Sequence, residues 1–373
     1  MEFILEASGS QYKLPKDLKP PFNYMGILIT ATAQFGNKSQ AYPLIMKTAD
    51  QFIQDICNFV DQLLRLLSAT SIITDDCFLR TFSDFLMVCS DSKVRSFRHT
   101  STLIALKLMT LLNGLVAWEQ ANLKEIWLQM FAKVFLERSN DVVEDIRYVC
   151  IAECGLWLDK YPESFVDQQQ VQHLYQALQD NCLKVCEASL QALLRLYHNP
   201  KLRPVCLEQG IKFRMTLLGL TMSAECELGQ MSIQLLIMFY RLTPQILDES
   251  MIQVIEQLVF AAHRGVAQAA ADLIPFRYHC ATTDKERIRV LVQFFIQFGQ
   301  HEHAAYFVDA FYGCNDIIMD WSSMVSMLLQ PESLSSPETS VLIEILTQAI
   351  KQAVTGEIPV GRYTKDLVLA VRI

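Results

Sequence analysis

Apolar residues recur along most of the chain at intervals of three and four positions, the spacing of one face of an α-helix. The clearest example runs from Cys89 to Thr110, and its apolar row, continued one residue further, consists of Val94, Phe97, Ile104, Leu108 and Leu111. No segment reads as a series of alternating strands, and the 13 glycines and 12 prolines fall mostly between helical stretches. The pattern predicts an all-helical protein.

Five of the predicted helices open in a similar way, with a short polar turn followed by a β-branched or leucine residue. The opening residues lie 52, 39, 43 and 38 positions apart, and they are Val94, Ile146, Val185, Leu228 and Val266. A period of about 40 residues with two helices per unit is typical of HEAT and armadillo repeats. Because one helix pair has too little partner surface alone, such units stack. The sequence therefore predicts an all-α, HEAT-repeat (armadillo-like) superhelical solenoid.

Two of the turns combine an acid with an arginine that follows shortly afterwards. Asp91 precedes Arg95, and Asp141 and Asp145 precede Arg147. We expect the acid to cap the helix, the β-branched residue to pack inwards and the arginine to bridge to the acid of the neighbouring repeat. Arg95 and Arg147 are therefore interpreted as contacts between repeats.

Composition divides the chain into four expected parts. They are an irregular lead-in with a first helix (1–40), a repeat solenoid (41–330), a loop rich in proline, serine and threonine (331–340), and a last helix with a tail (341–373). The acidic start lacks the pattern of a signal peptide. The longest apolar run, Ser101 to Trp118, is interrupted by Lys107 and Asn113 and is amphipathic, so we expect no membrane span.

Charge and cysteine content narrow the class of protein. A net charge of -8 argues against a generally basic nucleic-acid binder but is compatible with a local basic stripe. The 11 cysteines follow no CxxC or framework spacing, which favours free thiols in a reducing compartment. Cys150/Cys154 and Cys182/Cys186 are each one helical turn apart; we interpret them as small apolar residues on buried faces rather than as metal ligands.

Catalytic motifs are missing from the sequence. It contains no nucleotide-binding glycine loop, no nucleophile elbow and no zinc-protease motif. His301 and His303 are the one close histidine pair, and alternate residues of a helix point in different directions, so we interpret them as structural. We predict no enzyme, no cofactor and no small-molecule substrate; a cysteine nucleophile is the remaining catalytic alternative.

Several segments, in a fixed order, resemble the stromalin (SA/STAG) family, the HEAT-repeat accessory subunits of cohesin. The similarity covers roughly residues 40 to 362, since an ordered series of this kind is more than a repeat period alone would give. The segments that carry it are Tyr42-Pro43-Leu44, Ser90 to Thr110, Glu144 to Phe165, Leu258 to Leu273, His301 to Leu329, Glu344-Ile345 and Pro359 to Arg362.

The resemblance implies a scaffold that docks on the kleisin subunit of cohesin, touches DNA and recruits regulators to chromosomes in the nucleus. Members of the family are usually much longer, so later repeats that contact kleisin would be missing here. They also usually carry a long charged helical hairpin after the segment that resembles Ser90 to Thr110. Here Leu112 to Gln129 is short and mostly apolar, so we expect that arm to be absent.

The resemblance also implies a pocket for aromatic peptide motifs. Phe213 matches its central phenylalanine, and Lys212 stands where an arginine is usual. Gln176 falls at the position of the pocket's tryptophan and Ser139 at that of its tyrosine. Because these changes remove apolar contact area, we expect weakened binding of the usual aromatic partners. We predict that Phe213→Ala weakens a protein partner without unfolding the chain.

The densest cationic cluster is a candidate for sequence-independent contact with DNA phosphates. It consists of Lys93, Arg95, Arg98 and His99. The alternative interpretation gives these residues to helix capping and to pairing between repeats.

The sequence thus predicts a non-enzymatic, chromosome-associated adaptor of the cohesin type that binds a kleisin segment and, weakly, chromatin. Its divergence suggests a meiotic specialisation. Two alternatives remain: a stromalin-derived protein that holds chromosomes together without cohesin, and a generic HEAT scaffold or carrier.

Overall fold

The computed structural model describes residues 1–35, 42–69, 76–114, 121–162, 168–278, 281–298, 304–312, 316–330 and 334–364. Within these ranges every regular element is a helix, apart from one isolated bridge between His263 and Tyr363. The prediction of an all-helical protein is confirmed. The chain forms two compact units, Met1–Leu202 (unit 1) and Arg203–Ile373 (unit 2).

Unit 1 is built from helices that pack against their neighbours along the chain. In chain order they are α1 (Glu2–Ala7), α2 (Tyr24–Phe35), α3 (Ala49–Ala69), α4 (Asp76–Ser90), α5 (Arg95–Gly114), α6 (Ala121–Met130), α7 (Leu136–Arg138), α8 (Glu144–Lys160), α9 (Gln168–Ala177) and α10 (Leu183–Tyr197). A 3-10 turn covers Pro43–Ile45, and a π-helical stretch, Phe131–Phe135, joins α6 to α7.

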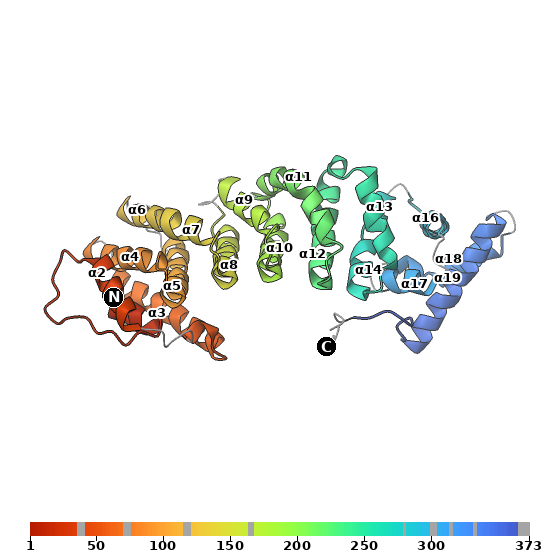
Figure 1. Ribbon diagram of the computed structural model, residues 1–373. Coiled ribbons are helices and arrows are strands. Elements are labelled where there is room, and N and C mark those ends of the chain that lie inside the picture. Colours follow the sequence, from red (N-terminus) through yellow and green to blue (C-terminus); the bar gives the residue numbers. More distant parts are fainter. Residues whose placement is uncertain are drawn as a thin grey trace. The chain divides into compact units, whose positions relative to one another are not determined.

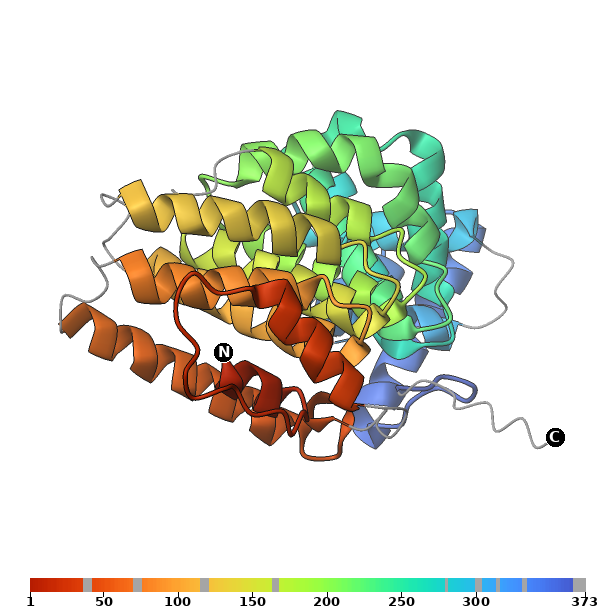
Figure 2. The same ribbon diagram turned by 60° about the vertical axis from the view of Figure 1, so that its left-hand side comes forward.

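Two layers make up the repeat region of unit 1. Helices α5, α8 and α10 pack side by side in one layer, while α4, α6 and α9 cover them from the other (Figures 1 and 2, orange to yellow-green). The core between the layers contains the fully buried side chains of Phe85, Phe97, Phe135 and Trp157. The short helix pairs and their shared core are the organisation expected of HEAT repeats.

Unit 2 continues the pattern of paired helices. Its helices are α11 (Arg203–Leu220), α12 (Cys226–Leu242), α13 (Glu249–Gln257), α14 (Arg264–Ala271), α15 (Ile274–Arg277), α16 (Asp284–Gln297), α17 (Ala304–Phe311), α18 (Trp321–Leu328) and α19 (Ser336–Thr355), with 3-10 turns at Pro244–Ile246, Leu258–Phe260 and Asp316–Met319. Helices α12, α14, α17 and α19 contact one another in succession. An aromatic cluster that includes Phe260, Phe294 and Phe307 fills the interior.

The predicted opening residues mark the starts of the inner helices. Ile146, Val185, Leu228 and Val266 each occupy the third position of a helix, and Val94 directly precedes α5. Ile146, Val185, Leu228 and Val266 are buried and Val94 is half-buried, so a similar polar turn at each start places an apolar residue on the packed side of the helix.

The predicted role of the turn acids as helix caps is wrong. The N-cap residues of α8 and α10 are Val143 and Cys182, and neither helix has a side-chain cap. Asp141 instead accepts a hydrogen bond from the Val143 N–H at 2.8 Å, and Asp180 accepts one from Cys182 at 2.7 Å. The acids lie two residues before the N-cap, so they close a turn that aims the chain into the helix.

Helix α19 begins inside the segment expected to be a loop. Ser335 and Glu338 form a reciprocal capping box, and Pro337 occupies the first turn, where it needs no backbone partner. The helix ends at Gly356, whose φ of 66° is left-handed. Among the described residues, no helix has the length and apolar character needed to cross a membrane.

Candidate functional site

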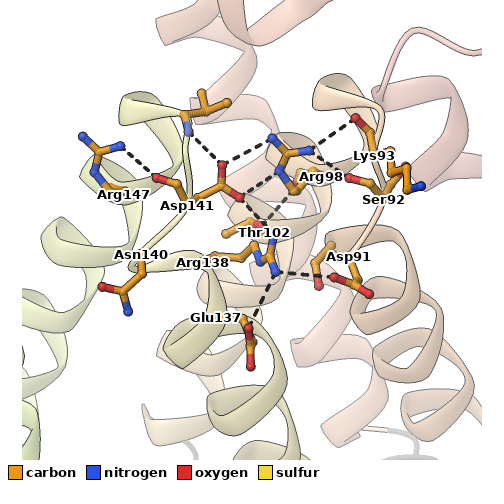
Figure 3. Close-up of polar contacts among 12 residues, drawn as sticks. Asp91, Ser92, Lys93, Arg98, Thr102, Glu137, Arg138, Asn140, Asp141 and Arg147 are labelled. Atoms are coloured by element: carbon orange, nitrogen blue, oxygen red, sulfur yellow. Dashed lines mark hydrogen bonds and ion pairs between the residues drawn. The ribbon is translucent and has the colours of Figure 1, made fainter.

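The cationic cluster predicted from the sequence lies at the turn between α4 and α5, where Arg98 is directed inwards. Its guanidinium donates to both oxygens of Asp141, from Nε to Oδ2 at 2.8 Å and from Nη2 to Oδ1 at 3.3 Å (Figure 3). Its Nη1 donates to the Ser92 carbonyl at 2.9 Å. Only 8% of Arg98 is exposed. Arg98 therefore ties its own turn to the turn of the next repeat.

The Asp141 carboxylate accepts hydrogen bonds from a second arginine as well as from Arg98. Arg138 donates from Nη1 to Asp141 Oδ2 at 3.0 Å and lies 3.4 Å from Asp91 Oδ1 (Figure 3). Together with the N–H of Val143, these donors satisfy a carboxylate whose side chain is almost fully buried. A buried charge is tolerated only when it is paired and hydrogen-bonded in this way.

The same contact recurs one repeat further along the chain. Arg147 donates from Nε and Nη2 to the two oxygens of Asp180, at 2.6 and 2.7 Å, and from Nη1 to the Asp141 carbonyl at 2.8 Å. Burial alone would raise the pKa of Asp180, but the Arg147 and Cys182 hydrogen bonds outweigh it and lower that pKa. We call the series Arg98–Asp141–Arg147–Asp180 the arginine ladder.

The predicted role of Arg95 and Arg147 as bridges between repeats is confirmed, and the two pairs differ in how exposed they are to solvent. Arg147 and Asp180 are mostly buried. Arg95 lies 2.6 Å from Asp145 of the next repeat, but the side chains are 46% and 42% exposed. Water therefore competes for the Arg95 pair and screens it.

His99 is buried as a neutral ring. Its Nδ1 lies 2.9 Å from the hydroxyl of Tyr42, and 4% of the residue is exposed. Burial lowers its pKa to about 4; the charges of Arg95 and Arg98 act in the same direction, and nearby Asp145 opposes them. The ring therefore carries no charge for a phosphate at neutral pH.

The four predicted nucleic-acid residues thus divide into two pairs. Arg98 and His99 are buried, whereas Lys93 and Arg95 are exposed at the start of α5. Contact with DNA remains a prediction, and Lys93 and Arg95 are the members of the cluster with surface to offer it.

Two of the predicted partner-binding residues line one small pocket in unit 1. Ser139 and Gln176 bound a cavity of about 200 Å³, together with His173 and the Arg147–Asp180 pair. Burial lowers the pKa of His173, against a hydrogen bond with Gln176. The pocket is lined by these polar groups and by the apolar side chains of Ile151, Ala177 and Val185.

The other two predicted partner-binding residues lie on α11 of unit 2. Phe213 is half-buried, and Lys212 is exposed with its Nζ 3.7 Å from Glu208. Their role in binding remains a prediction.

Three family models match the chain in sequence order. They are described as the STAG domain (residues 40–134), the stromalin conservative domain (140–209) and the cohesin subunit SCC3/SA HEAT-repeats domain (306–372). The chain belongs to the stromalin family. Cohesin subunit SA-1 of Xenopus laevis is 27% identical over 436 residues, which include 100% of this stromalin and 34% of the relative. Cohesin subunit scc-3 of Caenorhabditis elegans is 26% identical over 97% of this chain and 38% of its own length.

The fold is also similar to that of a solved cohesin subunit. The cohesin subunit Scc3 from Z. rouxii, residues 88–1035, superposes with a TM-score of 0.75 at 13% identity, over 95% of this stromalin and 51% of that chain. The fold is a HEAT-repeat solenoid, as predicted. This stromalin spans about a third of the length of the curated relatives it matches. The family is one of cohesin subunits rather than of enzymes.

Sequence reasoning missed a buried charge on the inner helices of this stromalin. Lys107 pairs with Glu153 of α8, whose other oxygen accepts from the Thr110 hydroxyl at 2.6 Å. Trp157 donates to the same hydroxyl at 2.6 Å. A lone lysine within the apolar α5 was the available signal, because a buried ammonium requires a carboxylate partner.

A second missed cluster centres on Asp309 in unit 2 of this stromalin. Gln352 donates to Asp309 Oδ1 at 2.7 Å, Arg264 lies 3.2 Å from the same oxygen, and Arg362 Nε lies 3.4 Å from Oδ2. Arg362 also donates to the Tyr306 carbonyl at 2.6 Å. Burial lowers the pKa of Arg362 to about 10, against the charge of Asp309.

Of the four cysteines spaced one helical turn apart in this stromalin, Cys150, Cys154 and Cys186 are buried free thiols and Cys182 is half-buried. Burial raises the pKa of Cys154 to about 12 and that of Cys186 to about 11. Cys186 donates to the Asp180 carbonyl at 3.3 Å. In the part of the chain that the structure describes, no three His, Cys, Asp or Glu side chains are placed to hold a metal; His301 and His303 lie outside the described residues.

Proposed function

We propose that this chain is a non-enzymatic, chromosome-associated adaptor of the cohesin accessory type, which binds a segment of the kleisin subunit and contacts DNA without reading its sequence. Its site of action would be the nucleus, on chromosomes, in support of sister-chromatid or homologue cohesion. The observation that carries the proposal is the ordered match of the three stromalin models along one chain.

The arginine ladder supports a binding mechanism. Arg98 and Arg147 tie successive turns of unit 1 together, so a partner that lies along these turns meets a surface that is already ordered. A preordered surface loses less conformational entropy when it binds. The arginines of the ladder are paired with aspartates of the same chain. An extended partner segment would therefore be recognised by other side chains at the surface.

The first test is co-purification with a kleisin fragment, followed by gel filtration at low and physiological salt. We expect a one-to-one complex that survives physiological salt. A folded, helical chain that elutes alone under both conditions would contradict the kleisin assignment.

A separate test addresses DNA. Lys93 and Arg95 are exposed, so Lys93→Glu/Arg95→Glu should weaken binding of a labelled duplex and flatten the salt dependence of its affinity. The matched control, with the same change in net charge, is Lys47→Glu/Arg65→Glu, at two exposed residues before and within α3; Arg65 pairs with Asp61 one turn away. Equal loss in both variants would assign the effect to net charge and not to this site.

A stromalin-derived protein that acts without cohesin is the second candidate. The observation that favours it is that Ser139 and Gln176, which line the pocket, offer no aromatic ring to an aromatic motif. An association with chromosomes that persists after depletion of kleisin would decide in favour of this candidate.

A further inference from the structure

Helix α11 is apolar on the side that faces away from its neighbours as well as on the side that packs. Its packed side buries Cys206 and Leu217, and the helix contacts α12. On the outside, Ile211 is 42% exposed, Met215 is 62% exposed, and Met222, in the turn that follows, is 63% exposed. Apolar residues therefore lie on both sides of a helix that also carries four charged residues.

The exposed residues form one continuous ridge. Ile211 and Met215 are one helical turn apart, and Met222 lies about two turns beyond Met215 on the same side. Leu218, which is half-buried, lies between Met215 and Met222 in this row, and half-buried Leu207 extends the row one turn before Ile211. Contiguous apolar surface of this kind marks binding sites, whereas single exposed apolar residues do not.

Gly219 lies at the edge of this ridge. A Cβ added there would meet no atom within 4 Å, so nothing in the chain's own packing requires a glycine. Glycine is also less favourable than alanine within a helix. What the glycine provides is a bare stretch of backbone, against which a second backbone can come close.

The charge of α11 opposes that of the chain. The helix carries Arg203, Lys212 and Arg214 against the single acid Glu208, in a chain whose net charge is -8. The Lys212 side chain is 57% exposed, and Arg214 donates to the Ile211 carbonyl, so its side chain lies along the helix. Phe213 lies on the opposite side of the helix from the ridge, and Lys212 and Arg214 are its neighbours in the sequence, about 100° to either side of it. The two cations therefore flank the ridge on opposite sides.

We propose that the outer face of α11 docks an amphipathic helix of a partner protein. The apolar stripe of that helix would cover Ile211, Met215 and Met222, its backbone would pass close to Gly219, and acidic residues on its flanks would face Lys212 and Arg214. The flexible thioethers of the two methionines suit such a surface because they adapt to the shape of an apolar partner. The proposal does not depend on whether the partner is a cohesin subunit.

The probe is a fluorescein-labelled designed helix about three heptads long, with leucines along one stripe and glutamates on both flanks. Its binding to the full chain is followed by fluorescence anisotropy. The test variants are Met215→Glu, which places a charge on the ridge, and Gly219→Leu, which fills the open space beside it. The control is Val354→Glu, an equally radical change at a residue of the same unit that is 78% exposed.

We expect saturable one-to-one binding that weakens at least ten-fold in both test variants and stays within two-fold in the control, with unchanged circular dichroism in all three. Exchange of the flanking glutamates for lysines should weaken the wild-type complex at least five-fold. Because Gly219→Leu enters open space, it decides the question even if Met215→Glu does not fold.

Other outcomes overturn the proposal. Absence of binding, or binding that both test variants retain, would show that the ridge receives no helix. A concentration-dependent dimer that Met215→Glu dissociates would assign the ridge to a second copy of the chain. Met215-dependent binding to anionic lipid vesicles, without binding to the designed helix, would assign it to a membrane surface.

Discussion

The arginine ladder of unit 1 and the Asp309 cluster of unit 2 both pair arginine with aspartate, but they arrange these residues in different ways. In the ladder, Arg98 meets Asp141 and Arg147 meets Asp180, each one repeat ahead. In the cluster, a single aspartate accepts a hydrogen bond from Gln352 of α19 and forms ion pairs with Arg264 of α14 and with Arg362, which follows α19. The ladder is periodic and distributes its ion pairs over successive turns. In the cluster, the ion pairs all involve one carboxylate. The comparison teaches that a repeat protein can hold its helices together both by many equivalent contacts and by one convergent contact.

The largest effect is expected at the convergent site. Asp309→Ala would leave Arg362, whose side chain is 0% exposed, with an uncompensated buried charge. Loss of one partner of a buried pair costs about 3–5 kcal/mol, so unit 2 should unfold at distinctly lower urea. Urea denaturation followed by circular dichroism, beside Asp248→Ala at the exposed cap of α13 as the control, measures it.

A loss below about 1 kcal/mol, the size typical of an exposed pair, would show that Arg362 finds enough acceptors in the carbonyls of Tyr306 and Val259. The convergent description would then fail.

Removal of one rung of the ladder should have the next largest effect. Arg98→Ala deletes the two bonds to Asp141 and the bond to the Ser92 carbonyl, but Arg138 still pairs with that aspartate. We expect a loss of about 2–3 kcal/mol, which is smaller than at Asp309 because the carboxylate keeps a partner. The same urea titration measures it, and a loss equal to that of Asp141→Ala would show that Arg138 does not share the load.

Acid should weaken unit 1 through His99. The folded pKa, about 4, lies below the ordinary value of 6.5, so the unfolded chain binds more protons between these pH values. This contribution is complete above pH 6.5 and is lost as the pH falls towards 4, by about 1–3 kcal/mol. Stability measured across this range in wild type and in His99→Gln gives the difference, and parallel curves would contradict the assignment.

The smallest effect is expected at the exposed rung. Arg95→Ala removes a pair whose members are both more than a third exposed, so the loss should stay below about 1 kcal/mol. A double-mutant cycle with Asp145→Ala isolates the pair from other contacts of either side chain. A coupling energy as large as that of Arg147 with Asp180 would abolish the distinction between exposed and enclosed rungs.

The sequence was sufficient for the fold and for the Arg147–Asp180 contact of the ladder because both follow from local spacing. The 3.6-residue period identifies helices, and the arginine after Ile146 together with the acid before Val185 predicts a contact from one repeat to the next. The burial of Arg98 could not be predicted in the same way. Arg95 and Arg98 both open α5, and only the path of the neighbouring turn determines which of them meets the interior.

The Asp309 cluster lay beyond sequence reasoning for a different physical reason. Arg264, Asp309 and Arg362 share no period, and their meeting depends on how three separate segments pack. Ser139 and Gln176 were singled out through family resemblance, and the cavity that they line also includes His173 and Gln179, which no motif singles out. Local spacing in the sequence predicts contacts between adjacent turns. Contacts among separate segments, such as those at Asp309, depend on tertiary packing.

The backbone pairing of Tyr363 has a consequence for the order of events during synthesis. The Tyr363 N–H donates to the Ala262 carbonyl at 3.1 Å, and its own carbonyl accepts from Arg264 at 2.9 Å, so segments about a hundred residues apart close on each other. A ribosome delivers the chain from the N-terminus at roughly 5–20 residues per second. The ladder can close turn by turn as each repeat emerges, whereas Asp309 has Arg264 as an early partner and gains Gln352 and Arg362 after α19 and the segment that follows it have been made. Unit 2 therefore completes its contacts only after translation has passed Tyr363.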